Sequence, residues 1–140
     1  MSESAMRSRV VKALACFDAQ AVETKMEDGV PDVNYIGGWI ELKQAKHWPP
    51  RKGILQLRHF TTHQRVWLYR RWCKGGRAFL LLRVKREWLL FDGVTASEIV
   101  GRADRTTLVD RCLRHWPNGL IEKEFRECMR KISPLESDSS

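Results

Sequence analysis

Between Lys43 and Arg86 the sequence lacks Asp and Glu altogether, although it carries 13 Lys and Arg residues in that stretch. Over the full 140 residues, 25 Lys and Arg stand against 17 Asp and Glu, which is a formal net charge of +8. A basic half without acids is typical of proteins that bind a polyanion, and nucleic acid is the simplest such partner. The alternative is a solvated basic surface with no such partner.

Long apolar runs are also absent. The longest, such as residues 79–82, are far shorter than the roughly 18 residues that a membrane helix needs, so we expect no membrane span and no membrane partner. Residues 1–9 are polar and lack the apolar stretch of a secretory signal, which favours a cytoplasmic location. The four cysteines have no CxxC spacing, and this disfavours both a zinc knuckle and a disulfide framework.

Apolar periodicity and turn residues predict an alternation of helices and strands. Ser2 or Ser4 suits the N-cap of a first helix, and Thr61 with Gln64 has the spacing of a capping box for a helix that the glycine pair at 75–76 ends. The expected helices cover residues 2–17, 61–74, 106–116 and 121–131, the strands 21–24, 33–36, 39–43, 77–84 and 88–91, an irregular basic loop 48–58 and a disordered tail 135–140. This order favours an α/β domain.

The glycine pair at residues 37–38 separates two β-prone runs and predicts a tight hairpin. If the pair forms the turn, Ile36 lies opposite Trp39, and counting outward places Asp32 opposite Lys43. One face of this hairpin is uniformly apolar and suits the core, because side chains alternate between the faces of a strand. That face carries Val33, Tyr35, Ile40 and Leu42.

Glu41 projects from the same face as Asp32 and Lys43 in this hairpin. The Cβ atoms of the two acids are expected about 6 to 8 Å apart, a span that one hard cation bridges. Mg²⁺, for which we expect Mn²⁺ to substitute, takes a few carboxylate oxygens and leaves positions for a phosphate oxygen and an attacking water. Lys43 is then placed to orient or deprotonate that water, or to stabilise charge that develops on the phosphate. The alternative is a surface hairpin in which Lys43 pairs with Asp32.

The string Gly29-Val30-Pro31-Asp32, followed after eight residues by Glu41-Leu42-Lys43, resembles the signature of the PD-(D/E)XK nuclease superfamily. The next helix, with Gln64 near its start, resembles the Holliday-junction-resolvase-like and VRR-NUC branches, which phages often carry. The resemblance covers residues 2–92 and implies a single restriction-endonuclease-like domain, with a mixed central sheet flanked by helices. We therefore predict one nuclease domain over residues 1–134, with its core at 2–92 and a C-terminal helical extension at 93–134.

The resemblance implies a role for each residue of the short motif. Asp32, Glu41 and the backbone carbonyl of Leu42 would hold the metal, and Lys43 would be the catalytic lysine. The family also places a metal-facing glutamate on the first helix. Glu3 fits this position because it lies on the inward edge of the predicted helix, three residues before Met6.

Two further acid and amide positions stay open. Glu23 competes with Glu3 as the additional acid, although an isolated acid in a short strand is equally suited to solvent. Gln64 matches the glutamine of the resolvase-like branch and is predicted to be catalytic. Its alternative role is ordinary helix capping with Thr61, which needs no catalysis.

Basic residues that follow the lysine of the motif are the expected contacts to nucleic acid. Contacts of this kind bind the phosphate backbone without reading sequence. The predicted set is Lys46, Arg51, Lys52, Arg58 and Arg65.

Together these features favour a Mg²⁺-dependent endonuclease that hydrolyses DNA phosphodiesters. Branched DNA is the expected substrate, because nothing in the sequence resembles a separate sequence-reading module. The resemblance implies a homodimer and, in a phage, the resolution of replication or recombination intermediates in the host cytoplasm. Three alternatives stay open: a nicking or restriction-type endonuclease on duplex DNA, a non-catalytic basic nucleic-acid-binding protein with the same fold, and an RNA-directed nuclease.

Overall fold

A computed structural model describes residues 1–23 and 27–134, and within them six strands form one sheet in the order β1-β2-β3-β4-β5-β6. β3 and β4 run parallel, and every other neighbouring pair is antiparallel. The α/β class and the mixed central sheet are therefore confirmed. The strands are β1 (Gln20–Ala21), β2 (Val33–Tyr35), β3 (Gly38–Ala45), β4 (Arg77–Val84), β5 (Glu87–Asp92) and β6 (Arg114–Trp116).

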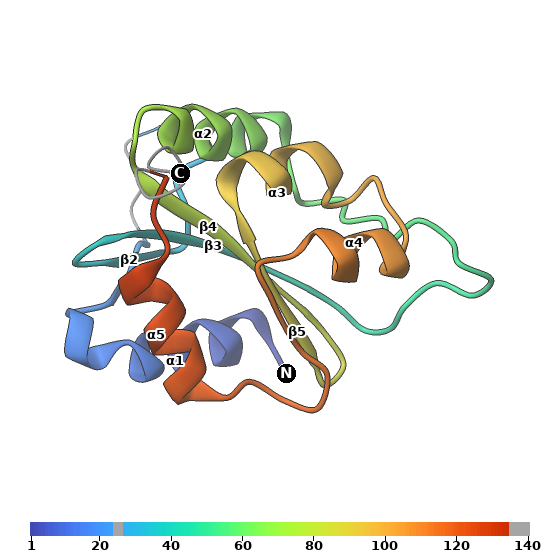
Figure 1. Cartoon of the computed structure of the whole chain (residues 1–140), viewed down its shortest axis with the longest axis horizontal. Coiled ribbons are helices and arrows are strands. Elements are labelled where there is room, and N and C mark those ends of the chain that lie inside the picture. Colours follow the sequence, from blue (N-terminus) through green and yellow to red (C-terminus); the bar gives the residue numbers. More distant parts are fainter. Residues whose placement is uncertain (24–26, 135–140) are drawn as a thin grey trace.

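Helices cover both faces of the sheet, as predicted (Figure 1). α1 (Glu3–Ala13) and α5 (Glu122–Lys131) pack on one face, and α2 (Thr62–Cys73), α3 (Gly93–Ile99) and α4 (Arg105–Arg111) pack on the other. A short 3₁₀ turn, Ala15–Phe17, follows α1. No helix in the described part of the chain is long and apolar enough to cross a membrane.

β4 lies near the middle of the sheet because its side chains are apolar on both faces. Phe79 and Leu81 point to the core under α1 and α5, while Leu80 and Leu82 point to the core under α2, α3 and α4. All four side chains are fully buried. A continuous apolar run is typical of a strand covered on both sides, and the predicted strand over 77–84 is confirmed to the residue.

The hairpin of β2 and β3 forms, but its register differs from the prediction by two residues. Tyr35 pairs with Gly38, so Ile36 and Gly37 make the turn. The prediction that Ile36 lies opposite Trp39 is wrong. Ile36 is instead 82% exposed at the tip of the hairpin.

A shift of two residues leaves the faces of the hairpin unchanged, because side chains alternate with a period of two. Val33 and Ile40 pair with each other and are buried in the core, as predicted. Extending the register by one residue beyond β2 brings Asp32 opposite Glu41, where the prediction had Lys43. The two acids are therefore nearer neighbours than predicted, since direct cross-strand partners lie closer than diagonal ones.

The C-terminal third differs most from the prediction. α3 was not expected, and the predicted helix over 106–116 is wrong in its second half, because α4 ends at Arg111 and β6 adds a strand to the sheet at Arg114–Trp116. Phe125 and Met129 of α5 are fully buried in the core that α1 shares. Residues 93–134 are thus not a purely helical extension, since they complete the sheet and contribute buried side chains to both of its cores.

At the N-terminal end, Ser2 caps α1 as predicted, and its hydroxyl accepts a hydrogen bond from the Ala5 amide at 3.0 Å. The helix itself stops at Ala13, short of the predicted end at 17. The predicted strand over 21–24 begins one residue earlier, at Gln20, and ends at Ala21, so the prediction is wrong for residues 22 and 23, while residue 24 lies outside the described part of the chain. The predicted tail over 135–140 also lies outside it.

Phe125→Ala tests whether the C-terminal third belongs to the core. The change removes a fully buried ring that packs edge-on against Trp116, so we expect a loss of about 3–5 kcal/mol in the free energy of unfolding. Urea denaturation followed by tryptophan fluorescence measures it. Val66→Ala, at a 54% exposed position on α2, is the control, with a change below about 0.5 kcal/mol. An unfolding midpoint that Phe125→Ala leaves unchanged would contradict the place of Phe125 in the core.

Candidate active site

A cleft of about 1330 Å³ opens between the first turns of α1, the second half of β3 and the segment that leads into α2. That segment, residues 46–60, contains four Lys and Arg residues and no acid, and is called the basic arm below. The cleft brings together all five residues predicted to be catalytic. They are Glu3, Asp32, Glu41, Lys43 and Gln64.

The cleft exists beside β3 because β2 is too short to cover that strand. β2 pairs only with Gly38–Ile40, whereas β4 pairs with β3 along its whole length. Residues 41–45 therefore have β4 on one side and the cleft on the other, and all five line the cleft. This open edge places the residues of the motif beside the cleft without interrupting the sheet.

Asp32 is fastened to β3 through the backbone. The Leu42 amide donates a hydrogen bond of 2.9 Å to Asp32 Oδ2. In a strand, the N–H and C=O of one residue point to the same side, so the Leu42 carbonyl also points toward the Asp32 side of β3. An aspartate carboxylate and a backbone carbonyl oxygen thus converge at the open edge.

Glu41 is the buried charge of the site, with only 1% of its surface exposed. Its Oε1 lies 3.6 Å from Lys43 Nζ. The same ammonium donates a hydrogen bond of 3.0 Å to the His59 carbonyl and lies 5.7 Å from the centre of the Phe60 ring. Lys43 is therefore held between β3 and the end of the basic arm.

The donor set at the open edge fits a hard cation. Asp32, Glu41 and the Leu42 carbonyl offer oxygen atoms only, and Mg²⁺ characteristically uses one or two carboxylates while keeping several waters. Within residues 1–23 and 27–134, no group of three or more His, Cys, Asp or Glu side chains lies close enough to hold a metal ion. Glu3 lines the cleft but does not complete a three-acid cluster, so the prediction that it is a direct ligand is not supported by its position.

The competing acid, Glu23, is exposed and is not among the described residues that line the cleft. Of the two candidates for the additional acid, Glu3 is the one at the site.

Gln64 has a structural role in addition to its place in the cleft. The Thr61 hydroxyl accepts a hydrogen bond from the Gln64 amide at 3.2 Å, and Gln64 Oε1 accepts one from the Thr61 amide at 2.9 Å. The predicted capping box is confirmed. The side-chain oxygen of Gln64 is thus engaged by the helix terminus, while the residue also lines the cleft.

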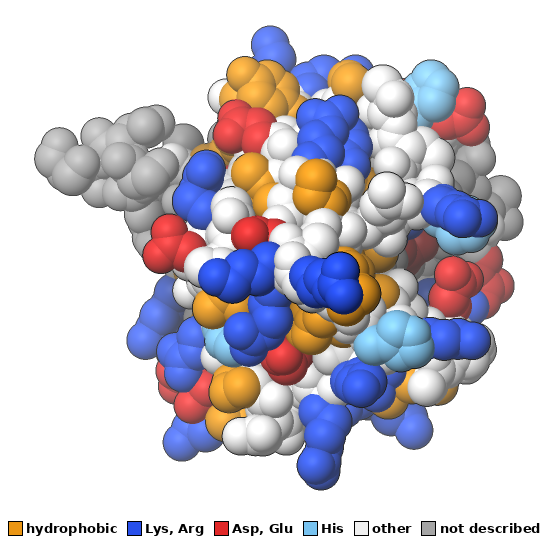
Figure 2. Space-filling model, turned by 90° about the vertical axis from the view of Figure 1, so that its right-hand side faces the viewer, with side chains coloured by type: hydrophobic (Ala, Val, Ile, Leu, Met, Phe, Trp, Pro, Cys, Tyr) orange, Lys and Arg blue, Asp and Glu red, His pale blue; other side chains and the backbone are white. Residues whose placement is uncertain are grey.

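The predicted nucleic-acid contacts fall into three groups. Lys46 and Arg58 line the cleft. Arg51 and Lys52 are exposed at the tip of the basic arm, with left-handed φ angles of 57° and 58°, and do not line it. The arm projects beyond the helices in Figure 1, and the end of the molecule that faces the viewer in Figure 2 is rich in Lys and Arg side chains.

Arg65, the fifth predicted contact to nucleic acid, does not line the cleft and makes contacts within the protein. Its guanidinium donates to the Ser97 carbonyl at 3.1 Å and stacks over the Phe60 ring at 4.3 Å. Burial, and then the positive charge of Arg102, lower the pKa of Arg65. The side chain joins α2 to α3 and the arm, and its contacts are structural.

The cleft also contains polar residues that were not predicted from the sequence, namely Arg7, Gln44, Gln56 and His59. Arg7 lies one helical turn after Glu3, and its i,i+4 spacing from that residue was a usable signal. His59 contributes its backbone carbonyl to Lys43, and no sequence pattern predicts such a contact.

Thr61→Ala and Gln64→Glu test the capping box at the start of α2. Thr61→Ala removes the hydroxyl of the cap, so we expect a loss of about 1 kcal/mol in the free energy of unfolding, measured by urea denaturation. Gln64→Glu keeps the capping box and is expected to keep the stability within about 0.5 kcal/mol. If Gln64→Ala leaves stability unchanged, the side chain does not cap α2 in solution.

This sequence matches no protein-family model, and neither a curated protein nor a solved structure matches it. The assignment of a function to the cleft therefore depends on the cleft's own residues. An assignment has to explain three features: two acids opposite each other on one face of the β2–β3 hairpin, a lysine beside them, and a basic arm at the rim.

Proposed function

We propose that this protein is a metal-dependent endonuclease that hydrolyses DNA phosphodiesters and prefers branched DNA such as four-way junctions. The observation that carries the proposal is that Asp32, Glu41 and Lys43 line one cleft beneath an acid-free basic arm. Two carboxylates alone would repel DNA, whereas carboxylates that share a divalent cation attract a phosphate. The resemblance of the motif to the PD-(D/E)XK nucleases supports the same chemistry.

In this mechanism, Asp32, Glu41 and the Leu42 carbonyl would hold Mg²⁺. When bound, the ion polarises the phosphate and lowers the pKa of a bound water. Lys43, held by Glu41 and the His59 carbonyl, presents its ammonium to the negative charge that develops on the phosphate.

Cations at the rim of the cleft bind the flanking backbone. Lys46, Arg58 and Arg7 line the cleft around the motif and orient the scissile bond by contacts to neighbouring phosphates. Such contacts carry no sequence information, which favours a substrate recognised by its shape. A homodimer, implied by the resemblance, would present two clefts to the two strands of a junction, and we expect it to act in the cytoplasm.

The alternatives differ in substrate or in turnover. A nicking or restriction-type endonuclease would use the same residues on linear duplex DNA, and an RNA-directed nuclease would use them on RNA. A non-catalytic binding protein would keep Lys43 and Glu41 as an ion pair only. A panel of DNA and RNA duplexes, forks, hairpins and junctions, assayed with Mg²⁺, Mn²⁺ and EDTA, distinguishes them.

Asp32→Ala and Lys43→Ala test the catalytic assignment. Each change removes a group from the cleft, so we expect cleavage of a four-way junction in Mg²⁺ to fall by about 100-fold or more. EDTA should abolish cleavage by the unchanged protein. Binding, measured by fluorescence anisotropy in EDTA, is expected to persist in both variants. Glu23→Gln, an exposed acid away from the cleft, is the matched control and should cleave normally.

Two outcomes would contradict the proposal in different ways. Cleavage that survives both Asp32→Ala and Lys43→Ala would place the active site elsewhere. If the unchanged protein binds the panel but cleaves no member with either metal, the binding-only alternative is favoured.

Lys46→Gln combined with Arg58→Gln tests the phosphate contacts. Each cation that releases counterions on binding contributes about 0.9 to the slope of log affinity against log salt concentration. We therefore expect the slope to become shallower by about 2 in the double variant. Lys123→Gln, at an exposed position on α5 away from the cleft, should leave the slope unchanged. An unchanged slope in the double variant would show that the cleft cations do not contact phosphates.

A further inference from the structure

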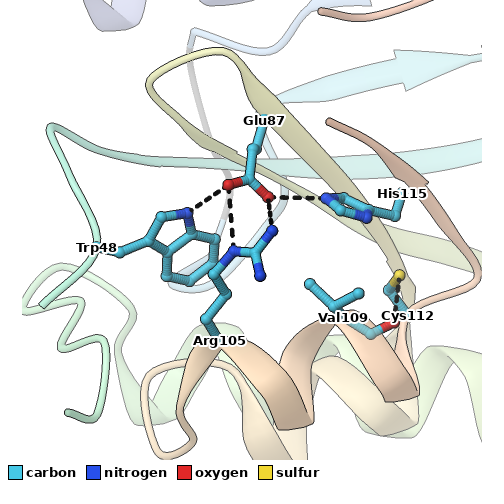
Figure 3. Close-up of polar contacts among 6 residues, drawn as sticks. All are labelled: Trp48, Glu87, Arg105, Val109, Cys112 and His115. Carbon is cyan, nitrogen blue, oxygen red and sulfur yellow. Dashed lines mark hydrogen bonds and ion pairs between the residues drawn. The ribbon is translucent and has the colours of Figure 1, made fainter. Parts of the chain in front are cut away.

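Glu87, at the start of β5, joins four segments of the chain through its carboxylate (Figure 3). Oε1 accepts a hydrogen bond of 2.9 Å from Trp48 Nε1, and Arg105 binds both oxygens, with Nε 3.2 Å from Oε1 and a terminal nitrogen 3.0 Å from Oε2. His115 Nε2 lies 2.8 Å from Oε2. Trp48 belongs to the basic arm, Arg105 to α4 and His115 to β6, so one carboxylate ties the arm to the body of the protein.

The Glu87 carboxylate is suited to this task because it stays ionised. Its side chain is 17% exposed, and this burial raises its pKa. Hydrogen bonds from Arg105, His115 and Trp48 act in the opposite direction and outweigh burial, so the pKa of Glu87 lies below its ordinary value. Hydrogen bonds to a charged acceptor, and a two-point contact with arginine above all, are stronger than neutral ones.

Along the chain, Trp48 lies between Lys46, which is in the cleft, and the tip cations Arg51 and Lys52. Trp48 is two residues beyond Lys46, which lines the cleft, and three residues before Arg51 at the tip. The other end of the tip is fixed by Leu55, which is buried and whose amide donates to the Ala103 carbonyl at 3.2 Å. Only residues 49–54 lie between these two attachments, so the tip is a short loop held at both ends.

The cluster in Figure 3 does not have the chemistry of a second catalytic site. The Cys112 thiol lies near it in the fold but donates its hydrogen bond to the Val109 carbonyl at 3.2 Å. Burial raises the pKa of that thiol, which keeps it protonated and poorly nucleophilic. The His115–Glu87 pair therefore has no thiolate to activate, and a structural action through Trp48 is the role that its contacts support.

We propose that Glu87 is a positioning residue, which holds Trp48 so that the cations at the tip of the basic arm contact the nucleic-acid backbone beyond the cleft. This inference rests on the proposed function, because it assigns the arm a polyanionic partner. A free arm would lose conformational entropy when it becomes ordered on nucleic acid. An arm that is already held in place loses less, and this favours binding. Loss of the attachment is expected to weaken binding without changing the chemical step, since Glu87 does not line the cleft.

Limited proteolysis tests the attachment without reference to nucleic acid. We expect trypsin to cleave after Arg51 and Lys52 about three- to tenfold faster in Glu87→Gln than in the unchanged protein, because the tip is released. Cleavage after Arg70 in α2 reports global unfolding, and its rate should increase less than the rate of cleavage at the tip. Trp48→Phe keeps the ring but loses the donor, and is expected to act in the same direction. Equal cleavage at the tip in all proteins would overturn the proposal.

A double-mutant cycle tests the connection to binding. Glu87→Gln is expected to raise the Kd for a four-way junction about three- to tenfold, with kcat at saturating substrate unchanged. In an Arg51→Gln/Lys52→Gln background the same change should have little further effect, because the cations that it positions are gone. A purely structural role would weaken binding by the same factor in both backgrounds. Glu98→Gln, an exposed acid paired with Arg111, is the control of equal charge.

The two experiments separate failure of this inference from failure of the proposed function. If trypsin cleaves the tip faster in Glu87→Gln but the unchanged protein binds no nucleic acid, Glu87 does attach the arm. In that case both the nucleic-acid partner and the nuclease assignment are wrong. If the protein cleaves junctions normally but the effects of Glu87→Gln and Arg51→Gln/Lys52→Gln on Kd are additive, the nuclease assignment stands and the positioning role of Glu87 is overturned.

Discussion

The parallel pairing of β3 with β4 over eight residues is the constraint on which the site depends. β4 is buried on both faces and lies between β3 and β5. β3 is therefore paired along its full length with a strand that packing holds in place. On its other side β3 is paired for three residues only. A strand supported from one side can display polar groups at its open edge without fraying, and this is what the cleft requires.

A buried carboxylate needs a compensating positive charge, and this requirement links the strand to the arm. Glu41 is almost completely buried and lies next to Lys43, whose ammonium also binds the His59 carbonyl. Lys43 thereby connects the Glu41 carboxylate to the end of the basic arm. At the start of the arm Glu87 plays a comparable part, since its carboxylate holds Trp48. Two glutamates outside the basic arm, Glu41 and Glu87, thus help to fix the position of an arm whose own Lys and Arg residues have no acid among them.

Local features of the chain were predictable from the residues themselves. The caps at Ser2 and Thr61, the strand over 77–84 and the shared face of Asp32, Glu41 and Lys43 follow from hydrogen bonding and side-chain alternation within a few residues. The hairpin register was not predictable in the same way. Gly38 pairs with Arg77 of β4, and this position takes glycine because a Cβ there would lie 2.3 Å from the Arg77 carbonyl oxygen, a contact between residues far apart in the chain.

The C-terminal third and the long-range partners show the same limit. α3 and β6 are short elements whose formation depends on packing against β4 and β5, so their sequence alone predicts little. Arg65 is a cation like its neighbours in the sequence, and only the positions of Ser97 and Phe60 make it structural.

By itself, the sequence determined the α/β class, the basic half and the face that two acids and a lysine share, because these depend on composition and on the two-residue period of a strand. The tertiary structure decided that Glu3 and not Glu23 lies in the cleft, that Lys43 is held by the His59 carbonyl, and that Glu87 anchors the arm. Each of these depends on a contact between segments that are distant in the chain. Such contacts arise only when the sheet brings the segments together, and no local pattern specifies them.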